Sequence, residues 1–239
     1  MRVVSLVPSV TETLLAWGVT PIAVTRFCEQ PTLPTVGGTK DPDLDRIVSM
    51  RPDLVVVNDE ENRRADADVL TSCGIALHVT HVSSVADVGP MLVALGDAVE
   101  RDDAGRAAAT ALAAVLLPHD RAPGIDPPAI GRRAFVPIWR RPWMTIAADT
   151  FGSSMLAACG WASAFADATD RYPTVTLDEV RAHRPDAVLL PSEPYPFGPR
   201  HVAELRDLAT DIRLVDGQDL FWWGSRTADA ITRLRIVLA

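Results

Sequence analysis

Aromatic side chains gather in three short segments of the second half of the chain. Of the 14 Phe, Trp and Tyr residues, only Trp17 and Phe27 precede residue 131. Seven others lie in segments 139–143, 192–197 and 216–226, each of which follows a predicted strand. These are Trp139, Trp143, Tyr195, Phe197, Phe221, Trp222 and Trp223. Because loops are normally polar, such rings indicate a platform for a large flat or apolar ligand; plugging the end of a core is the competing interpretation.

Arginines accompany these rings. Arg140 and Arg141 stand between Trp139 and Trp143, and Arg226 follows the last aromatic pair. A guanidinium group can stack on a ring or form two parallel hydrogen bonds with a carboxylate or a phosphate. These three arginines are therefore candidates for contacts with polar groups of a ligand, although plain solvation on a loop would also explain them.

Polar segments follow the predicted strands of the first half. Residues 8–12, "PSVTE", read as the opening of a helix, with Ser9 or Thr11 as the N-cap and free N–H groups that could meet an anionic or carbonyl group. Residues 58–63, "NDEENR", begin with Asn58 and carry three acids in a row. Such a run is usually a solvated helix start.

Metal-binding and catalytic patterns are weak. His78 and His81 are three residues apart on a predicted strand, so they face opposite sides and cannot share a metal. No dinucleotide-binding, phosphate-binding or nucleophile-elbow motif occurs, and nothing places a base beside Cys28. We therefore predict no catalytic residue and no metal site.

The composition excludes several classes of partner. The 239 residues carry 23 basic and 31 acidic side chains, a net charge of −8, whereas nucleic acids and anionic membranes call for a basic face. No run of 18 apolar residues is present, so we expect no membrane insertion. The three cysteines are far apart, which indicates neither a disulfide framework nor a zinc knuckle.

Short β-branched runs alternate with helical patterns, which predicts an α/β fold with mostly parallel sheets. The expected strands are Val3–Val7, Pro21–Thr25, Leu54–Asn58, Ala76–Thr80, Ala134–Ile138, Ala187–Pro191 and Ile212–Val215. The expected helices are Thr11–Trp17, Leu44–Met50, Arg64–Cys73, a helical stretch over 84–117 that Pro90 and Gly96 interrupt, Ser153–Cys159, Leu177–His183 and Thr227–Leu238.

One unit of the pattern occurs twice. "LDRIVSMRPDLVVV" at 44–57 and "LDEVRAHRPDAVLL" at 177–190 match in Leu-Asp, Arg-Pro-Asp and the apolar run. The proline ends the helix, the aspartate can bond nearby backbone, and the apolar run reads as a buried parallel strand. We therefore expect two lobes: an N-terminal βα lobe over 1–83, a helical connector with a proline-rich loop over 84–130, and a C-terminal βα lobe over 131–239.

Five segments in order resemble the helical-backbone (class III) substrate-binding proteins, the receptors of ABC importers for vitamin B12, ferric siderophores and haem. They are "RVVSLVPSVTETLLAWG", "GVTPIAVTRFCEQP", "LDRIVSMRPDLVVV", "DTFGSSMLAACGW" and "TLDEVRAHRPDAVLL". Within the family the chain is most similar to the cobalamin-binding branch, through its opening strand and helix and through "LFWWGSR".

The resemblance implies two Rossmann-like lobes joined by a long helix, with a ligand held between them and no catalysis. It adds the following ligand-binding candidates: Ser9, Phe27, Asn58, Trp139, Tyr195, Phe221 and Trp222, with the arginines of "WRRPW" for the ligand's side arms. The ligand would be cobalamin or a ferric chelate, and no resident cofactor is expected. The implied partner is an ABC permease, docked through a surface glutamate on each lobe (Glu61 with Glu193 or Glu204), and we expect a monomer.

The expected compartment depends on the N-terminus. "MRVVSLVPS" has no apolar leader core and no small-residue cleavage site. We therefore expect a cytoplasmic protein as the sequence stands, and an extracytoplasmic one if a leader has been removed. The alternative function is a cytoplasmic α/β metal-handling protein or enzyme, using His81, Cys28, Glu29 or the acids of 59–61.

Overall fold

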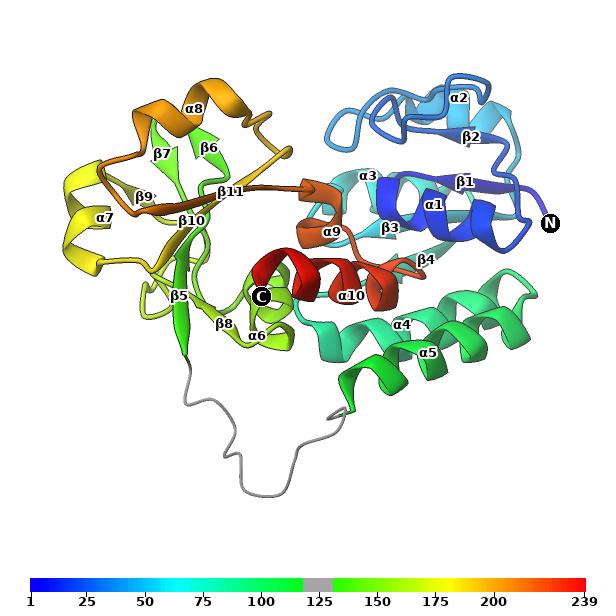
Figure 1. The fold of residues 1–239 in the computed structure, drawn as a ribbon. Coiled ribbons are helices and arrows are strands. Elements are labelled where there is room, and N and C mark those ends of the chain that lie inside the picture. Colours follow the sequence, from blue (N-terminus) through cyan, green and yellow to red (C-terminus); the bar gives the residue numbers. More distant parts are fainter. Residues whose placement is uncertain (118–130) are drawn as a thin grey trace. The chain divides into compact units, whose positions relative to one another are not determined.

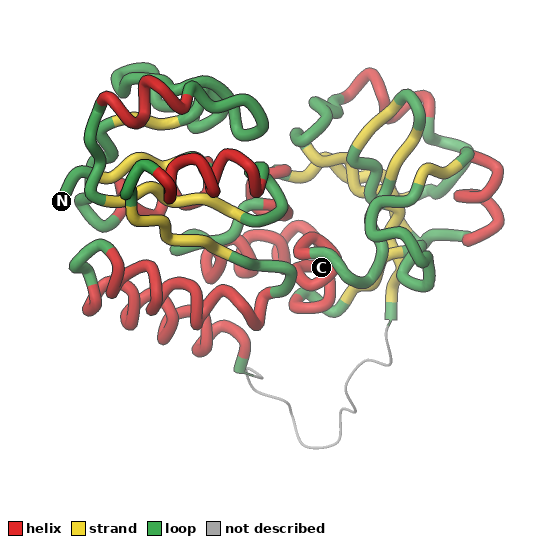
Figure 2. Tube along the Cα trace, turned by 180° about the vertical axis from the view of Figure 1, so that it is seen from behind, coloured by secondary structure: helices red, strands yellow, loops and turns green. Residues whose placement is uncertain are grey.

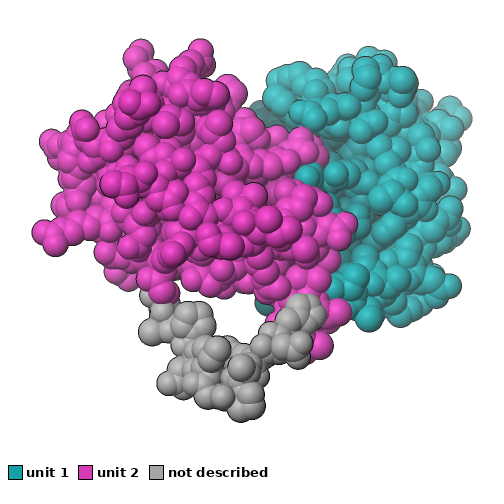
Figure 3. All heavy atoms as spheres, viewed as in Figure 1, with its two compact units in different colours: residues 1–82, 86–112, 223–226 teal, residues 83–85, 113–222, 227–239 magenta. Residues whose placement is uncertain are grey.

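The computed structural model describes residues 1–117 and 131–239, and the chain divides into two compact units. Unit 1 comprises Met1–Val82, Ala86–Leu112 and Trp223–Arg226; unit 2 comprises Ser83–Val85, Ala113–Trp222 and Thr227–Ala239 (Figure 3). Most of the segment expected as a connector, residues 86–112, belongs to unit 1. The proline-rich segment 118–130 lies outside the described residues.

Unit 1 is built on a four-stranded parallel sheet with the order β2-β1-β3-β4. Its strands are β1 (Val3–Ser5), β2 (Ala23–Val24), β3 (Leu54–Asn58) and β4 (Ala76–Thr80). All five residues of β3 are buried, as an apolar run covered on both faces requires. The first two strands are shorter than predicted because the chain turns into α1 directly after Val7 and into a loop after Val24.

The helices of unit 1 are α1 (Pro8–Ala16), α2 (Leu44–Ser49) and α3 (Arg64–Ser72), together with most of α4 (Val85–Ala98) and α5 (Asp102–Leu116). Helix α1 begins three residues earlier than predicted, since Pro8 occupies its first position and Val7 is the N-cap, without a side-chain cap bond. Neither Ser9 nor Thr11 is the cap. Thr11 instead donates its hydroxyl to the Val7 carbonyl within the helix.

Helices α4 and α5 run side by side (Figure 1, Figure 2). The helical pattern of 84–117 breaks at Glu100, whose φ of 57° lies in the left-handed region, and not at Pro90 or Gly96. Gly96 has a packing role: a Cβ there would lie 3.1 Å from the Cα of Gly105 in α5. The two glycines thus let the two helix backbones approach closely.

Unit 2 contains a second four-stranded parallel sheet, with the order β11-β10-β5-β8. Its strands are β5 (Arg132–Phe135), β8 (Trp161–Ser163), β10 (Ala187–Pro191) and β11 (Asp211–Val215). Its buried apolar cluster includes Phe135, Phe165, Val188 and Leu190. The strand predicted at 134–138 begins and ends earlier, because residues after Phe135 leave the sheet, and the edge strand β8 was not predicted.

A small antiparallel sheet and five whole helices complete the part of unit 2 that the structure describes. The sheet joins β6 (Trp139–Arg140), β7 (Trp143–Met144) and β9 (Thr174–Val175). The helices are α6 (Phe151–Ala158), α7 (Leu177–His183), α8 (Pro199–Glu204), α9 (Gly217–Phe221) and α10 (Thr227–Leu238). Residues 139–143 are therefore a β-hairpin rather than a loop, which places their aromatic side chains on a regular support.

The repeated Arg-Pro-Asp unit makes the same set of bonds in each unit. Arg51 and Arg184 both follow their helix in the left-handed conformation, with φ of 48° and 47°. In unit 1 the Asp53 carboxylate accepts the backbone N–H of Arg2 at 2.5 Å. In unit 2 the Asp186 carboxylate accepts the backbone N–H of Arg133 at 2.7 Å.

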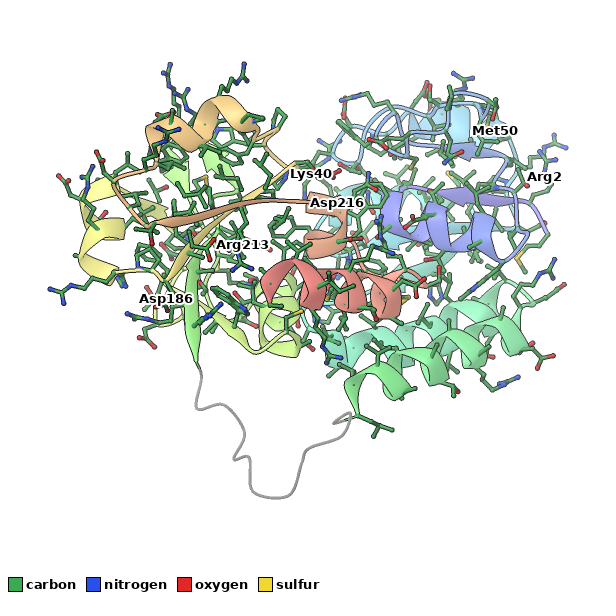
Figure 4. All side chains as sticks on the ribbon, in the orientation of Figure 1. Arg2, Lys40, Met50, Asp186, Arg213 and Asp216 are labelled. Atoms are coloured by element: carbon green, nitrogen blue, oxygen red, sulfur yellow. The ribbon has the colours of Figure 1, made fainter. Side chains whose placement is uncertain are left out.

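The side chains of Arg2 and Arg133, whose backbone N–H groups bond the two aspartates, also bond the end of the helix that precedes each aspartate. Arg2, which Figure 4 labels together with Met50, donates its guanidinium to the carbonyls of Met50 and Arg51. Arg133 donates to the carbonyl of His183. These carbonyls end α2 and α7, where the helix leaves them without intrahelical partners. The duplicated sequence therefore encodes a duplicated staple, which ties the end of a helix to the start of the first strand of each sheet.

We expect Asp53→Ala and Asp186→Ala each to lower the free energy of unfolding by about 1–2 kcal/mol, because each leaves a backbone N–H without its carboxylate partner. Chemical denaturation of each variant provides the measurement. Asp207→Ala, at an exposed aspartate, is the control and should change stability by less than about 0.5 kcal/mol. If all three variants were equally stable, the hydrogen bonds of Asp53 and Asp186 would not stabilise the fold, and the prediction would be wrong.

Candidate functional site

At the carboxyl end of β3 in unit 1, Asn58 organises the following turn. Its side-chain oxygen accepts the N–H groups of Glu60 and Glu61, both at 3.0 Å, and its amide nitrogen donates to the carbonyl of Thr80 at 3.1 Å. The Asn62 side chain accepts the N–H of Asn58 at 2.8 Å. Asn58 is 3 % exposed, so its amide shapes the turn from within.

This turn carries an acid with unusual titration. Burial raises the pKa of Glu61 to about 7, and neighbouring Glu60 adds to the rise, while Lys40 opposes it. Lys40 itself donates its ammonium group to the carbonyl of Glu60 at 2.5 Å. A carboxyl group with a pKa of about 7 is close to half protonated at neutral pH, so it can either donate or accept a hydrogen bond there.

The raised pKa predicts a pH dependence of stability. An acid whose pKa rises on folding takes up a proton in the folded state between its unfolded value of about 4.5 and the folded value of about 7, so stability falls as pH increases through that window. We expect Glu61→Gln to remove about 3 kcal/mol of this dependence, since the pKa rises from 4.5 to about 7 and one pKa unit corresponds to about 1.4 kcal/mol. Denaturation of the variant and the native chain at pH 4.5 and pH 8 measures this pH dependence of stability. Equal pH profiles for Glu61→Gln and the native chain would contradict the prediction.

Two other candidates of unit 1 differ in accessibility. Ser9 is 4 % exposed within α1, and its carbonyl accepts the hydroxyl of Thr13. Phe27 is 50 % exposed, with the Arg26 guanidinium 4.9 Å from its ring centroid. Arg26 also pairs with Asp41 at 3.1 Å. Phe27 is thus a ring held at the surface by its neighbour, whereas Ser9 is part of the helix packing.

The groups of the enzyme alternative are engaged in structural bonds. Cys28 is 3 % exposed, and its sulfur lies 3.2 Å from the hydroxyl oxygen of Thr11, which places its thiol inside unit 1. His81 bonds Asp59 at 2.7 Å, and this hydrogen bond raises the pKa of His81. Within residues 1–117 and 131–239, no three His, Cys, Asp or Glu side chains are grouped to hold a metal ion.

In unit 2 the predicted aromatic residues form a connected cluster. The Trp139 ring meets Tyr195 edge-on, with 5.5 Å between centroids, and Tyr195 lies 4.7 Å from Phe197. Trp143 stacks on Phe197 at 6.0 Å and packs against the core of the unit. Trp139 is 46 % exposed and is the most accessible ring of this cluster. Tyr195 and Trp143 are partly buried, and Phe197 is buried.

The two arginines of the hairpin are placed differently. Arg140 forms a two-pronged ion pair with Glu204 of α8, with nitrogen–oxygen distances of 2.8–3.0 Å. The hydrogen bonds that Arg140 donates to the Glu204 carboxylate raise the pKa of Arg140. Arg141 is exposed. Because Glu204 already pairs with Arg140, it is not an isolated surface carboxylate.

Phe221 and Trp222 end α9 and meet different partners. A Cβ on Gly152 of α6 would lie 2.7 Å from the Phe221 ring, so that ring packs directly on the helix backbone. The indole N–H of Trp222 donates to the carboxylate of Glu193 at 2.9 Å. Trp222 is only partly buried, and this bond fixes the direction of its ring.

The next four residues pack within unit 1. Trp223 is 5 % exposed, and a Cβ on Gly224 would lie 2.3 Å from the Thr13 hydroxyl of α1. The backbone N–H of Ser225 donates to the same hydroxyl at 3.1 Å. Arg226 pairs with Glu12 at 3.3 Å, and its side chain is 13 % exposed. Residues 223–226 therefore form a strap that packs over α1, and the charge of Arg226 is engaged in the ion pair with Glu12.

Sequence reasoning missed the residues that α8 contributes beside the aromatic cluster. His201 is 3 % exposed and lies 5.7 Å from Tyr195 and 5.2 Å from Phe197, measured between ring centroids. Arg200 precedes it on the surface. The sequence signal was available, because Gly198-Pro199 is a helix start.

Comparison with known proteins decides the family. A family model described as periplasmic binding protein matches residues 3–210, well over half of the chain. The chain belongs to the periplasmic binding protein family. The two parallel sheets with helices between their strands are those of its class III, helical-backbone members, so the predicted family and fold are confirmed.

Individual relatives support the same assignment. The chain is 29 % identical over 196 residues to a vitamin B12-binding protein of Salmonella choleraesuis, covering 79 % of this chain and 71 % of that one. It is 25 % identical over 199 residues to a vitamin B12-binding protein of Vibrio vulnificus, covering 79 % and 70 %.

Solved structures are similar over nearly the whole chain. The periplasmic vitamin B12 binding protein BtuF of Vibrio cholerae has a TM-score of 0.81 at 20 % identity, covering 99 % of this chain and 96 % of that one. The periplasmic heme-binding protein RhuT from Roseiflexus sp. RS-1 has a TM-score of 0.79 at 20 % identity, covering 99 % and 97 %. At this identity, the likeness supports the fold.

Membership of the family has direct consequences. Periplasmic binding proteins are the substrate-binding components of ABC importers, and they bind small ligands without transforming them. The chain is therefore a binding protein rather than an enzyme, and its family implies a permease as partner. Its relatives are periplasmic, and none of its described helices combines the length and apolar character that crossing a bilayer requires.

Proposed function

We propose that the protein binds a corrinoid, or a similarly flat metal chelate, as the substrate-binding component of an ABC importer. The observation that carries the proposal is the similarity to vitamin B12-binding proteins over 79 % of the chain. The exposed rings of Phe27 in unit 1 and Trp139 in unit 2 support it, because large accessible aromatic side chains suit a flat, partly apolar ligand.

The candidate residues would take two roles. The rings of Phe27, Trp139 and Trp222 would contact the ligand, since each has accessible surface. Arg141 would reach its polar arms. A second set would position these groups from behind: Ser9, Asn58, Arg140, Trp143, Tyr195, Phe221 and Arg226.

The remaining parts of the proposal concern context. We propose that the protein works outside the cytoplasm, as its relatives do, and that it is a monomer that delivers its ligand to a permease. It would need no resident cofactor, because the metal arrives within the ligand. Sedimentation of the purified protein, with and without ligand, would test the monomer.

Equilibrium titration tests the ligand. Cobalamin, haem and a ferric siderophore are added separately while tryptophan fluorescence is followed, since a bound chelate quenches nearby indole rings. We expect at least one to bind with a dissociation constant below roughly 100 μM, about −5.5 kcal/mol. Phe27→Ala and Trp139→Ala should each weaken that binding, while Tyr172→Ala, at an exposed ring outside the candidate set, should not. If none of the three ligands binds in this range, the proposal fails.

A further inference from the structure

The carboxylate of Glu193 lies shortly after the end of β10, in unit 2. Strands β10 and β11 are parallel, with Pro191 opposite Val215, so the residues that follow β10 run beside the residues that open α9. The backbone N–H of Ser192 donates to the carbonyl of Val215 at 3.1 Å, which continues this pairing beyond the strand. The register of the sheet therefore brings Glu193 alongside α9, the helix that Trp222 directly follows.

Contacts at both ends of the side chain fix Glu193. A Cβ on Gly217 would lie 2.5 Å from the backbone nitrogen of Glu193 and 2.7 Å from its Cγ atom, so only glycine allows this approach. At the far end, Glu193 Oε2 accepts the indole N–H of Trp222 at 2.9 Å. The carboxylate and the indole ring therefore hold each other in one relative orientation.

The second oxygen of this carboxylate is not used within the protein. Glu193 forms no ion pair with residues 1–117 or 131–239, and its Oε1 atom accepts no hydrogen bond from them. Glu193 is partly buried, where an acceptor without a donor costs free energy. Oε1 is thus an acceptor for a bound molecule, next to the Trp222 ring that we expect to contact the ligand.

An acceptor at this place separates two classes of flat metal chelate. Corrinoids carry primary amide side arms, which both donate and accept hydrogen bonds, whereas haem carries carboxylates, which only accept at neutral pH. The exposed guanidinium of Arg141 can donate to the oxygen of either group, so it does not distinguish them. A carboxylate on the protein does distinguish them, because it accepts from an amide N–H and repels a second carboxylate.

We propose that Glu193 is a specificity-determining residue, whose Oε1 accepts an N–H of a ligand amide arm while its Oε2 holds the ring of Trp222. The ligand class that it selects is a flat chelate with uncharged amide arms, and the class that it rejects has carboxylate arms. This inference rests on the proposed function and narrows the choice of chelate from two classes to one.

The test compares two corrinoids that share one ring. Cobinamide has amide arms where cobyrinic acid has carboxylic acids, so with cyanide bound to both cobalt ions the two ligands differ chiefly in those arms. Titration of the full-length protein, followed by tryptophan fluorescence, gives each dissociation constant. We expect the native chain to bind cobinamide at least about tenfold more tightly than cobyrinic acid. Equal or tighter binding of cobyrinic acid would overturn the proposal.

Glu193→Gln isolates the effect of the carboxylate. The oxygen of the glutamine amide can still accept the Trp222 indole N–H, while its NH2 group puts a donor where Oε1 was an acceptor. We expect the preference for cobinamide to fall at least about fivefold, with cobinamide bound about threefold more weakly and cobyrinic acid bound more tightly. An unchanged ratio of the two dissociation constants would contradict the role of Glu193.

Asp207→Asn is the matched control for charge. It removes the same negative charge from an exposed position of unit 2, so it should leave the ratio of the two dissociation constants within about twofold of the native ratio. Circular dichroism checks that both variants are folded. If Asp207→Asn changes the ratio as much as Glu193→Gln does, cobyrinic acid responds only to net charge and the proposal is wrong.

A second readout follows the ring without any ligand. The indole N–H signal of Trp222 in proton–nitrogen correlation spectra is assigned by its loss in Trp222→Ala. It should move in Glu193→Ala, which removes the acceptor, and move much less in Glu193→Gln, which keeps one. A Trp222 signal that is the same in Glu193→Ala and in the native chain would overturn the positioning part of the proposal.

Failure of this inference can be told apart from failure of the proposed function. If cobinamide binds and Glu193→Gln leaves the ratio unchanged, the protein binds corrinoids and only the role of Glu193 is wrong. If haem binds and cobinamide does not, the protein still binds a flat chelate, and the role of Glu193 is again wrong. If no chelate binds, both proposals are wrong.

Discussion

Replacing Trp223 by alanine is expected to lower the free energy of unfolding by about 3–5 kcal/mol, the usual cost of removing a buried tryptophan side chain. Trp223 is 5 % exposed and precedes Gly224, whose backbone packs on α1. Replacing the adjacent Trp222 should cost far less stability, because that ring is only partly buried. It should instead weaken ligand binding by about 1–3 kcal/mol if the ring stacks on the ligand.

The two substitutions are each other's control. Thermal melting is measured for Trp222→Ala and Trp223→Ala separately. Ligand titration of each variant is then carried out at a temperature where both variants are folded. A third variant, Glu193→Gln, replaces the carboxylate that accepts the Trp222 indole N–H. It should weaken binding less than Trp222→Ala does. If both tryptophan variants melt early and bind normally once folded, Trp222 belongs to the core and has no part in recognition.

The second large effect is expected at Gly105, where α5 crosses closest to α4. A Cβ at this position would lie 2.5 Å from the carbonyl oxygen of Leu92 and 3.2 Å from the Cα of Gly96, so the two helix backbones would have to separate. We expect Gly105→Ala to lower the free energy of unfolding by about 3 kcal/mol, at the upper end of the cost of overpacking.

Gly89 provides the matched control within α4. A Cβ there would meet no atom within 4 Å. Gly89→Ala should therefore stabilise the protein by about 0.5–1 kcal/mol, because alanine loses less conformational freedom than glycine in a helix. Denaturant titration of the two variants measures whether each substitution lowers or raises the free energy of unfolding. A Gly105→Ala variant as stable as Gly89→Ala would show that the helices can move apart without cost.

Periodicity alone located the long central elements. The strands Leu54–Asn58, Ala76–Thr80 and Ala187–Pro191 and the helices Leu177–His183 and Thr227–Leu238 have the predicted bounds. These elements either have continuous apolar runs or end at strong signals such as Arg-Pro-Asp. Both kinds of signal are local, so they survive the influence of tertiary packing.

Short elements escaped prediction because tertiary contacts create them. Strands β6, β7 and β9 have two residues each, too few for any periodicity, and they form by pairing with one another. Helix α9 begins at Gly217, where a Cβ would lie 2.5 Å from the backbone nitrogen of Glu193. Only the folded chain brings that neighbour close.

The candidate site was predictable by residue type but not by role. The clustering of rings after strands correctly drew attention to Trp139 and Tyr195, which touch. It could not separate the exposed ring of Trp139 from the supporting ring of Trp143. Nor could it foresee that Arg140 and Arg226 would each pair with a carboxylate, Glu204 and Glu12, because those partners are distant in sequence.

The strap of residues 223–226 has a consequence for dissecting the protein. Since these four residues belong to unit 1 although the chain on either side belongs to unit 2, no single cut of the polypeptide separates the two units. A fragment that ends at Leu112 would lack the backbone N–H that bonds Thr13 and the arginine that pairs with Glu12. Fragment complementation would have to return that strap to α1, so the C-terminal piece would act as a binding partner for the N-terminal one.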